Sequence, residues 1–307
     1  MNQNGIDAIL TLFIVMGIGF VLKKTGLVNK AAEDFIANLL QRVSIPALML
    51  YTVTTQFTES FLREYYPGII VSFLTILASI IAGLVIARLF HINEKNQGIF
   101  TSMFAFSNTI FIGVPVIFGI FGEAGIPYLM LYYLMNTFLF WTMGVFLIAG
   151  DKNPRLFSVD TLKKLFNPAI SAFLLGLALI YTKTTLPVSI MLSLNYLTSL
   201  VVPLSTLYMG SIIADMNFKR LPGLKPTLLI LFGRFVFSPF LALAILKFFG
   251  FSGLLVQVIV IASALPVMSQ ISILAGYYGK DKQYTAFMTA LTTLLCIFIL
   301  PVYFKFM

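Results

Sequence analysis

Two apolar stretches of this chain are each interrupted by a proline that stands beside small and polar residues. The first reads Ser107-Asn108-Thr109-Ile110-Phe111-Ile112-Gly113-Val114-Pro115, and the second reads Ser263-Ala264-Leu265-Pro266-Val267-Met268-Ser269-Gln270. In hydrocarbon a helix is favoured because it satisfies its own backbone, so an interruption leaves amides and carbonyls that need partners. Matched pairs of interrupted helices are typical of the binding sites of transporters. The sequence therefore predicts a ligand site built by these two segments.

The polar groups of the two stretches favour an anionic or a neutral ligand. We expect the first helix to unwind at Gly113–Pro115 and the second at Pro266. Each helix start carries about half a positive charge and several free amides, so two converging starts would bind a carboxylate. Asn108 adds two donors and one acceptor. The candidate ligand-binding residues are Asn108, Thr109, Gly113, Pro115, Pro266, Ser269 and Gln270; the alternative is that Asn108, Ser269 and Gln270 only hold helices together.

Four further polar residues lie inside apolar segments. Arg234 is the one charge placed deep in such a segment, where a charge costs about 2.5–3.5 kcal/mol. It serves as counter-ion to an anionic ligand, or it snorkels toward the cytoplasmic face or binds helix C-terminal carbonyls. Asn136 and Thr137 interrupt an aromatic run, and they either line the ligand cavity or pack helices together. Arg42 lies nearer the end of its segment and is expected to snorkel.

Several kinds of chemistry are disfavoured by what the sequence lacks. The single histidine, His91, stands in a loop beside Arg88, which excludes zinc-protease motifs and Ser-His-Asp triads. All eleven acidic residues lie at segment ends or in loops, which argues against a carboxylate proton relay and a cationic substrate. The single cysteine, Cys296, is expected to be a small buried apolar residue. We therefore expect no catalytic site, no metal site and no cofactor.

The composition indicates that these residues are carried by membrane helices. Of the 307 residues, 59% are hydrophobic and 10% are charged, whereas soluble domains have about 25% charged residues. A spanning helix needs about 20 apolar residues. Ten ranges meet that description approximately: 6–22, 34–57, 66–88, 97–121, 125–149, 168–182, 188–213, 226–249, 253–277 and 283–304. The fold class predicted is an all-α polytopic membrane protein with ten transmembrane helices.

The distribution of Lys and Arg predicts the direction in which these helices run. Odd-numbered loops hold 14 Lys and Arg, and the opposite side holds four. Positive residues favour the cytoplasm, so both termini are expected outside and the central loop 150–167 inside. The N-terminus does not resemble a signal peptide, because Asp7 precedes the first apolar stretch and Lys23 and Lys24 follow it. We expect a multi-pass protein of the plasma membrane, in a bacterium the inner membrane.

The ten segments are expected to form two inverted repeats of five, residues 1–149 and 168–307. An odd number of spans per half reverses the orientation of the second half. Pro46 precedes Pro115 by 69 residues, and Pro203 precedes Pro266 by 63, so each half has a kinked second span and a broken fourth span. The alternative is that prolines are simply common in membrane helices. In the repeat, helices 4 and 9 are the broken, crossing pair.

The first interrupted stretch, with Phe118-Gly119 after it, resembles the fourth-span motif of the auxin efflux carrier family. Asn167-Pro168, Ala264-Leu265-Pro266 and Tyr278-Gly279-Lys280-Asp281 are also similar to that family. The similarity covers essentially the whole chain, and the short central loop favours the bacterial branch of malate and malonate permeases. The resemblance implies a scaffold of spans 1, 2, 6 and 7 and a mobile transport domain of spans 3–5 and 8–10. It also implies an elevator-like motion and a homodimer, with Asn108, Pro115 and Pro266 at the substrate.

The function expected is therefore secondary transport of a small organic anion by alternating access. A sodium-coupled symporter of the same architecture is one alternative, since broken helices also expose carbonyls that suit Na⁺. An intramembrane enzyme and a non-transporting membrane sensor are two others. The partners expected are the organic anion, the lipid bilayer and a coupling ion, Na⁺ or H⁺, with no nucleic acid. The sequence does not name the acid, the coupling ion or the direction of transport.

Overall fold

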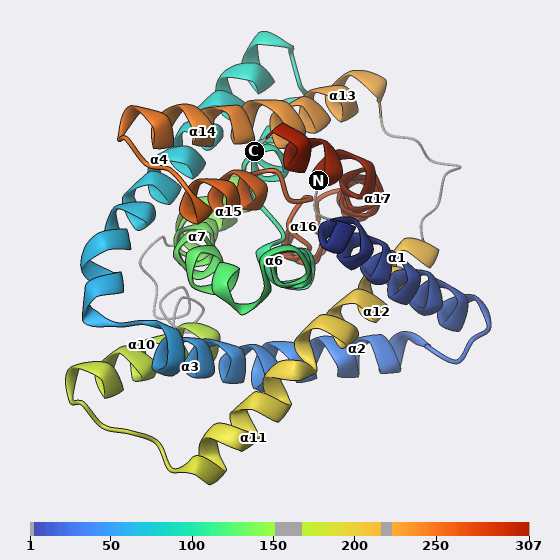
Figure 1. Cartoon of the computed structure of the whole chain (residues 1–307). Coiled ribbons are helices and arrows are strands. Elements are labelled where there is room, and N and C mark those ends of the chain that lie inside the picture. Colours follow the sequence, from blue (N-terminus) through green and yellow to red (C-terminus); the bar gives the residue numbers. More distant parts are fainter. Residues whose placement is uncertain (1–2, 151–167, 216–222, 307) are drawn as a thin grey trace. The chain divides into compact units, whose positions relative to one another are not determined.

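The computed structural model describes residues 3–150, 168–215 and 223–306, and these residues are almost entirely helical (Figure 1). Within this part of the chain no strand is present, and one isolated antiparallel bridge pairs Ser107 with Val267. The all-helical prediction is therefore confirmed for the described residues. Most of the predicted central loop, Asn167 before span 6, and Lys219 and Arg220 lie outside them.

The described residues form two compact units, and each is built from segments that are distant in the sequence. The first unit takes the described parts of Met1–Pro67, Ile110–Met130 and Leu165–Asp215. Its helices are α1 (Gln3–Lys24), α2 (Lys30–Leu39), η1 (Leu40–Ser44), α3 (Ile45–Gln56), the start of α4 (Glu59–Leu89), most of η2 (Thr109–Gly113), α6 (Val114–Phe121), η3 (Gly122–Gly125), the start of α7 (Ile126–Leu139), α10 (Pro168–Tyr181), α11 (Val188–Ser199) and α12 (Val201–Ala214).

The second unit takes the described parts of Gly68–Thr109, Leu131–Lys164 and Met216–Met307. It contains the remainder of α4 and of α7, with α5 (Glu94–Ala105), η4 (Phe140–Gly144), α8 (Val145–Ala149), α13 (Leu224–Phe232), η6 (Gly233–Phe237), α14 (Ser238–Phe248), α15 (Leu254–Ser263), α16 (Gln270–Tyr277) and α17 (Lys282–Phe306). Both interrupted stretches contribute their break to this unit.

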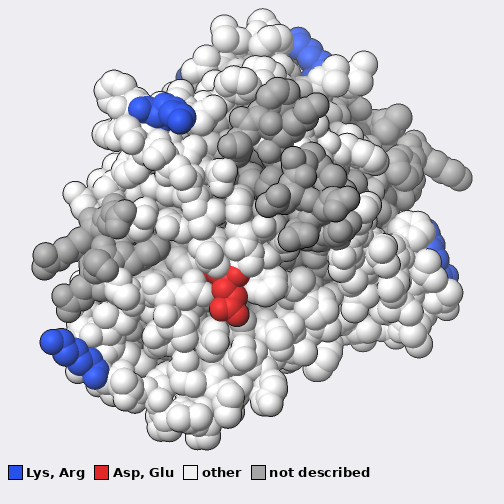
Figure 2. Space-filling model, in the orientation of Figure 1, with Lys and Arg blue, Asp and Glu red and all other residues white. Residues whose placement is uncertain are grey.

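Six helical segments of the described chain are long and apolar enough to cross a membrane. They are Lys30–Gln56, Tyr65–Leu89, Thr109–Ala149, Val188–Ala214, Leu224–Phe248 and Lys282–Tyr303. Two shorter apolar helices are Pro168–Tyr181 and Leu254–Ser263. Among the described residues, few charged side chains appear on the face shown in Figure 2. These lengths and compositions indicate a multi-pass membrane protein, and the ten-span inverted repeat stays a prediction.

Three prolines explain where the long helices widen into π-helical turns. Pro46, Pro115 and Pro239 each follow a π-helical segment, η1, η2 and η6 respectively, by two residues. A proline has no N–H and clashes with the carbonyl four residues before it, so the preceding turn must open. In η6 the carbonyl deprived of this donor is that of Phe235, and the hydroxyl of Tyr303 donates a hydrogen bond to it. These three widened turns are therefore local consequences of sequence; the fourth π-helical segment, η4, has no proline after it.

The positions of the two helix breaks differ in how well the sequence predicts them. The second break is where it was predicted: α15 ends at Ser263, Pro266 lies in the extended segment, and α16 begins at Gln270. The first break was predicted at Gly113–Pro115, and that prediction is wrong. The chain is extended at Phe106–Asn108 and is helical again from Thr109, so Pro115 lies in the first turn of α6 and only widens the turn before it.

Small residues let the helices of the first unit approach until their backbones touch. Helix α1 packs against α12 (Figure 1), and a Cβ on Gly19 would lie 2.2 Å from the carbonyl oxygen of Leu207. A Cβ on Gly210 would lie 1.9 Å from the carbonyl oxygen of Met16. Close backbone contact at small residues is a principal source of helix association in membranes. These two glycines therefore fix the crossing of α1 and α12.

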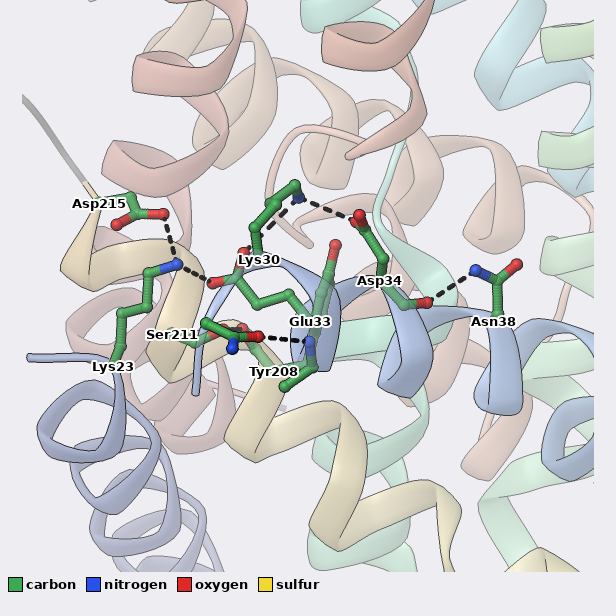
Figure 3. Close-up of polar contacts among 10 residues, drawn as sticks. Lys23, Lys30, Glu33, Asp34, Asn38, Tyr208, Ser211 and Asp215 are labelled. Carbon is green, nitrogen blue, oxygen red and sulfur yellow. Dashed lines mark hydrogen bonds and ion pairs between the residues drawn. The ribbon is translucent and has the colours of Figure 1, made fainter. Parts of the chain in front are cut away.

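An ion-pair cluster joins the ends of three helices in the same unit. Lys23, at the end of α1, lies 2.9 Å from Glu33 and 3.0 Å from Asp215 (Figure 3). Glu33 is 1% exposed and also lies 3.6 Å from Lys30, which pairs with Asp34 at 3.0 Å. Burial alone would lower the pKa of Lys23, but the hydrogen bonds and charges of Glu33 and Asp215 raise it, so the ammonium stays charged.

Replacing Lys23 with Met should lower the free energy of unfolding by about 1–3 kcal/mol, because a buried carboxylate loses its nearest cation. Lys30 still faces Glu33, which keeps the loss below that of a fully isolated buried charge. The measurement is the thermal unfolding of the detergent-purified protein. Lys24→Met is the matched control, since Lys24 is the exposed neighbour on the same helix. Equal destabilisation by the two changes would contradict a role for the cluster.

Candidate functional site

The two interrupted helices cross in the second unit, where their extended segments pair like two short strands. The amide of Asn108 donates to the carbonyl of Pro266 at 2.8 Å, and the amide of Met268 donates to the carbonyl of Phe106 at 3.2 Å. These bonds flank the bridge between Ser107 and Val267. All six residues are buried, so each backbone group that the breaks expose needs a partner. The two bonds of the pairing satisfy four of these groups.

Two side chains from other helices close the outer edges of this pair of segments. The side-chain amide of Asn136, on α7, accepts from the amide of Ser107 at 3.1 Å and donates to its carbonyl at 3.0 Å. On the other edge the hydroxyl of Thr292, on α17, accepts from the amide of Val267 at 3.1 Å. Asn136 and Thr292 are both fully buried. They replace the neighbouring strands that a sheet would provide.

Arg234 lies at the crossing with no exposed surface. Its guanidinium makes six hydrogen bonds, to the carbonyl oxygens of Phe104, Ala105, Ser263 and Leu265 and to the hydroxyl of Ser107, at 2.6–3.3 Å. Phe104 and Ala105 end α5, and Ser263 ends α15. The guanidinium therefore binds the negative ends of two helix dipoles. Of the roles predicted for Arg234, the one found is the binding of helix C-terminal carbonyls.

Glycine 233 explains how Arg234 reaches the end of α5. A Cβ at this position would lie 2.3 Å from Cδ2 of Phe104, so a larger residue would require Phe104 or the helix that carries it to shift. Gly233 also begins the π-helical segment η6, and such segments are frequent at functional sites. The close approach and the widened turn together carry the guanidinium to the carbonyls. Sequence reasoning did not single out this glycine.

Two helix starts meet on the same crossing. The helical segment η2 begins at Thr109, directly after Asn108, and α16 begins at Gln270, directly after Ser269. The side-chain amide of Asn108 donates to the hydroxyl of Ser269 at 2.8 Å, which joins the two starts. Asn108 and Thr109 are buried, whereas Ser269 and Gln270 are only half-buried. The start of α16 is therefore the accessible part of the crossing.

The structure brings together most of the residues that the sequence singled out. Asn108, Thr109, Asn136, Arg234, Pro266, Ser269 and Gln270 all belong to the crossing or directly adjoin it. Gly113 and Pro115 do not: they group with the first unit and lie in helix, Gly113 ending η2 and Pro115 in the first turn of α6. Thr137 is buried beside Asn136. Arg42 lies exposed in η1, as a snorkelling side chain does.

Three residues that sequence reasoning did not place in the site take part in the crossing. Ser107 accepts from Arg234 and its hydroxyl lies 3.1 Å from the hydroxyl of Tyr132. Thr292 caps the second extended segment. A signal for Ser107 was its place at the start of the polar run. A single threonine in an apolar helix carries no such signal, because most bond their own helix, as Thr142 does with the carbonyl of Phe138.

Asn136→Leu should reduce the free energy of unfolding by about 2–4 kcal/mol, because each of the two buried backbone groups of Ser107 left unpaired costs about 1–3 kcal/mol. Thr142→Val is the matched control. Thr142 follows Asn136 by six residues, and its hydroxyl donates only to the carbonyls of Phe138 and Leu139 in the preceding turn. Thermal unfolding of the two purified variants checks this. A loss no greater than that of Thr142→Val would show that Asn136 does not secure the extended segment.

Comparison with known proteins gives the class of molecule that carries this crossing. A family described as membrane transport protein matches residues 5–304 of the chain. An uncharacterized transporter of Methanocaldococcus jannaschii is 24% identical over 303 residues, which are 97% of each protein. An uncharacterized transporter of Methanothermobacter thermautotrophicus is 26% identical over 308 residues, covering 97% of this chain and 96% of the relative. The resemblance to auxin efflux carriers is thereby confirmed, and this chain belongs to that family of membrane transport proteins.

Proposed function

We propose that this protein is a secondary transporter that carries a small organic anion by alternating access. The observation that carries the proposal is that the helix C-termini at the crossing have a cationic partner, whereas the helix N-termini have no anionic one. Arg234 neutralises the two helix C-termini, whereas the two helix starts, at Thr109 and Gln270, have no acidic side chain beside them in the described sequence. What remains is a pair of positive helix ends, each equivalent to about half a charge. Such an arrangement favours a negatively charged ligand.

The side chains beside these helix starts suit a carboxylate. Asn108 and Ser269 already join through a 2.8 Å hydrogen bond, so an amide and a hydroxyl stand together at the start of α16. Gln270 adds a second amide on the half-buried first turn of that helix. Each of these groups can donate a hydrogen bond to an anionic oxygen, and bonds to charged groups are the stronger ones. We assign Asn108, Ser269 and Gln270 to substrate binding on these grounds.

For the transport step we propose that one unit moves as a body relative to the other, in the manner of an elevator. The division of the chain into two compact units supports this assignment. Helices α1, α2, α3, α10, α11 and α12 group in one unit and would form the scaffold; α5 and α13–α17 group in the other, with the crossing, and would form the transport domain. Residues 110–130 depart from the scheme, because they group with the first unit.

Asn108→Ala should lower kcat/KM for uptake of the carried acid into proteoliposomes by about 10- to 100-fold, because a hydrogen bond to a charged group is worth about 1.5–3 kcal/mol. Asn38→Ala provides the matched control: Asn38 is exposed on α2 and bonds only the carbonyl of Asp34. Uptake of every mono- and dicarboxylate at the wild-type rate in Asn108→Ala would refute the assignment of Asn108.

The wild-type protein should be stabilised by a small carboxylate and not by its neutral amide. A ligand at 100 times its Kd adds about 2.7 kcal/mol to the stability of the state that binds it. The measurement is the melting temperature of the purified protein against a panel of mono- and dicarboxylates, each paired with the corresponding amide. Equal shifts from acid and amide, or no shift from any acid in the panel, would count against an anionic substrate.

A further inference from the structure

The oxygen atoms around the guanidinium of Arg234 form the kind of shell that binds a small cation. Four are backbone carbonyls, from Phe104, Ala105, Ser263 and Leu265, and one is the hydroxyl of Ser107. They come from the C-terminal ends and the unwound parts of two interrupted helices. In ion-coupled carriers, carbonyls at such positions coordinate Na⁺. Here a side chain of the protein itself occupies them.

We infer that Arg234 is the permanent cation of this crossing, which takes the place that a coupling Na⁺ would take, so that transport does not require Na⁺. This inference rests on the proposed function and identifies the residue that supplies the positive charge at the crossing. The guanidinium cannot lose its proton and is covalently tethered, so the charge is present in every state of the cycle. A Na⁺ bound by the same oxygens would be repelled at short range by the guanidinium.

Two features of the structure hold the guanidinium of Arg234 in this position. Gly233 permits the contact with Phe104 that carries Arg234 to the end of α5. All six hydrogen bonds of the guanidinium go to neutral oxygens, so its charge is balanced by helix ends rather than by a carboxylate. Removal of the side chain would leave the same inward-facing oxygens around a guanidinium-sized space. A truncated variant should therefore bind free guanidinium.

The first test is the ion dependence of the wild-type protein in proteoliposomes. Uptake of the carried acid at a fixed membrane potential should be the same in Na⁺ as in choline. Loss of uptake on removal of Na⁺ would overturn the inference, and it would leave the proposed function intact. Because this arm needs no variant, it does not depend on how well Arg234 tolerates substitution.

The second test is chemical rescue of Arg234→Ala, followed by thermal unfolding, which requires no knowledge of the substrate. The variant should melt below wild type and be stabilised by millimolar guanidinium in a saturable manner, whereas urea, which has the same shape without the charge, should not stabilise it. Its uptake should fall about tenfold or more, equivalent to about 1.4 kcal/mol, and recover in part with guanidinium. Stabilisation by Na⁺ over choline in this variant alone would also support the inference.

Two further variants complete the design. Arg234→Lys retains a charge but presents fewer donors, so it should fold, transport more slowly and stay independent of Na⁺. Arg42→Ala is the matched control, because Arg42 is exposed in the π-helical segment η1, and guanidinium should have no effect on it. Equal effects of guanidinium on Arg234→Ala and Arg42→Ala, or equal rescue by urea, would overturn the inference. A wild-type protein that takes up no carboxylate would refute the proposed function while the thermal arm still tests Arg234.

Discussion

The contact on which the crossing depends is that of one guanidinium with the C-terminal ends of two helices. The ends of α5 and α15 each carry about half a negative charge, so together they balance the single charge of Arg234. Burying an unpaired charge would cost several kcal/mol, and six hydrogen bonds offset that cost. The oxygens that the guanidinium occupies cannot at the same time coordinate a second cation. The same side chain therefore holds the two breaks together.

The extended segments are stabilised because many of the backbone groups they expose are paired from another part of the chain. An interrupted helix would otherwise leave buried amides and carbonyls unsatisfied, at about 1–3 kcal/mol each. The two segments pair with each other through Asn108 and Met268, and the outer edges are closed by Asn136 and Thr292. Because these partners come from helices α5, α7, α15 and α17, the local geometry of the crossing follows from the packing of the whole unit. The proposed site would therefore be preorganised by its framework, and the half-buried start of α16 is its accessible part.

The sequence predicted features that depend on local composition and segment length, but not those that depend on contacts between distant residues. Composition and apolar segment length predicted a helical membrane protein, and the break around Pro266 lies where it was expected. The break predicted at Pro115 is wrong, because that proline only opens the turn before it. The first break lies instead at Phe106–Asn108, where the chain pairs with a segment about 160 residues away. For Arg234 the sequence left two roles open, because the difference between them is which oxygens surround it. Thr292 had no signal at all, since its hydroxyl is one of many in α17 and only the position of Val267 gives it a role.

The edges and the centre of the crossing differ in symmetry, and this difference bears on how a ligand would bind. At both edges the closing side chain comes from the helix that follows the interrupted one: Asn136 after the first break and Thr292 after the second. That correspondence is what an inverted repeat would produce, and it supports the proposed repeat independently of the prolines. The centre has a single arginine, which reaches both breaks from one side, so the two halves cannot be equivalent there. Since Arg234 covers the C-termini of α5 and α15, the proposed anion would be held at the positive ends of the segments that follow them, η2 and α16, whose starts adjoin beside Asn108 and Ser269.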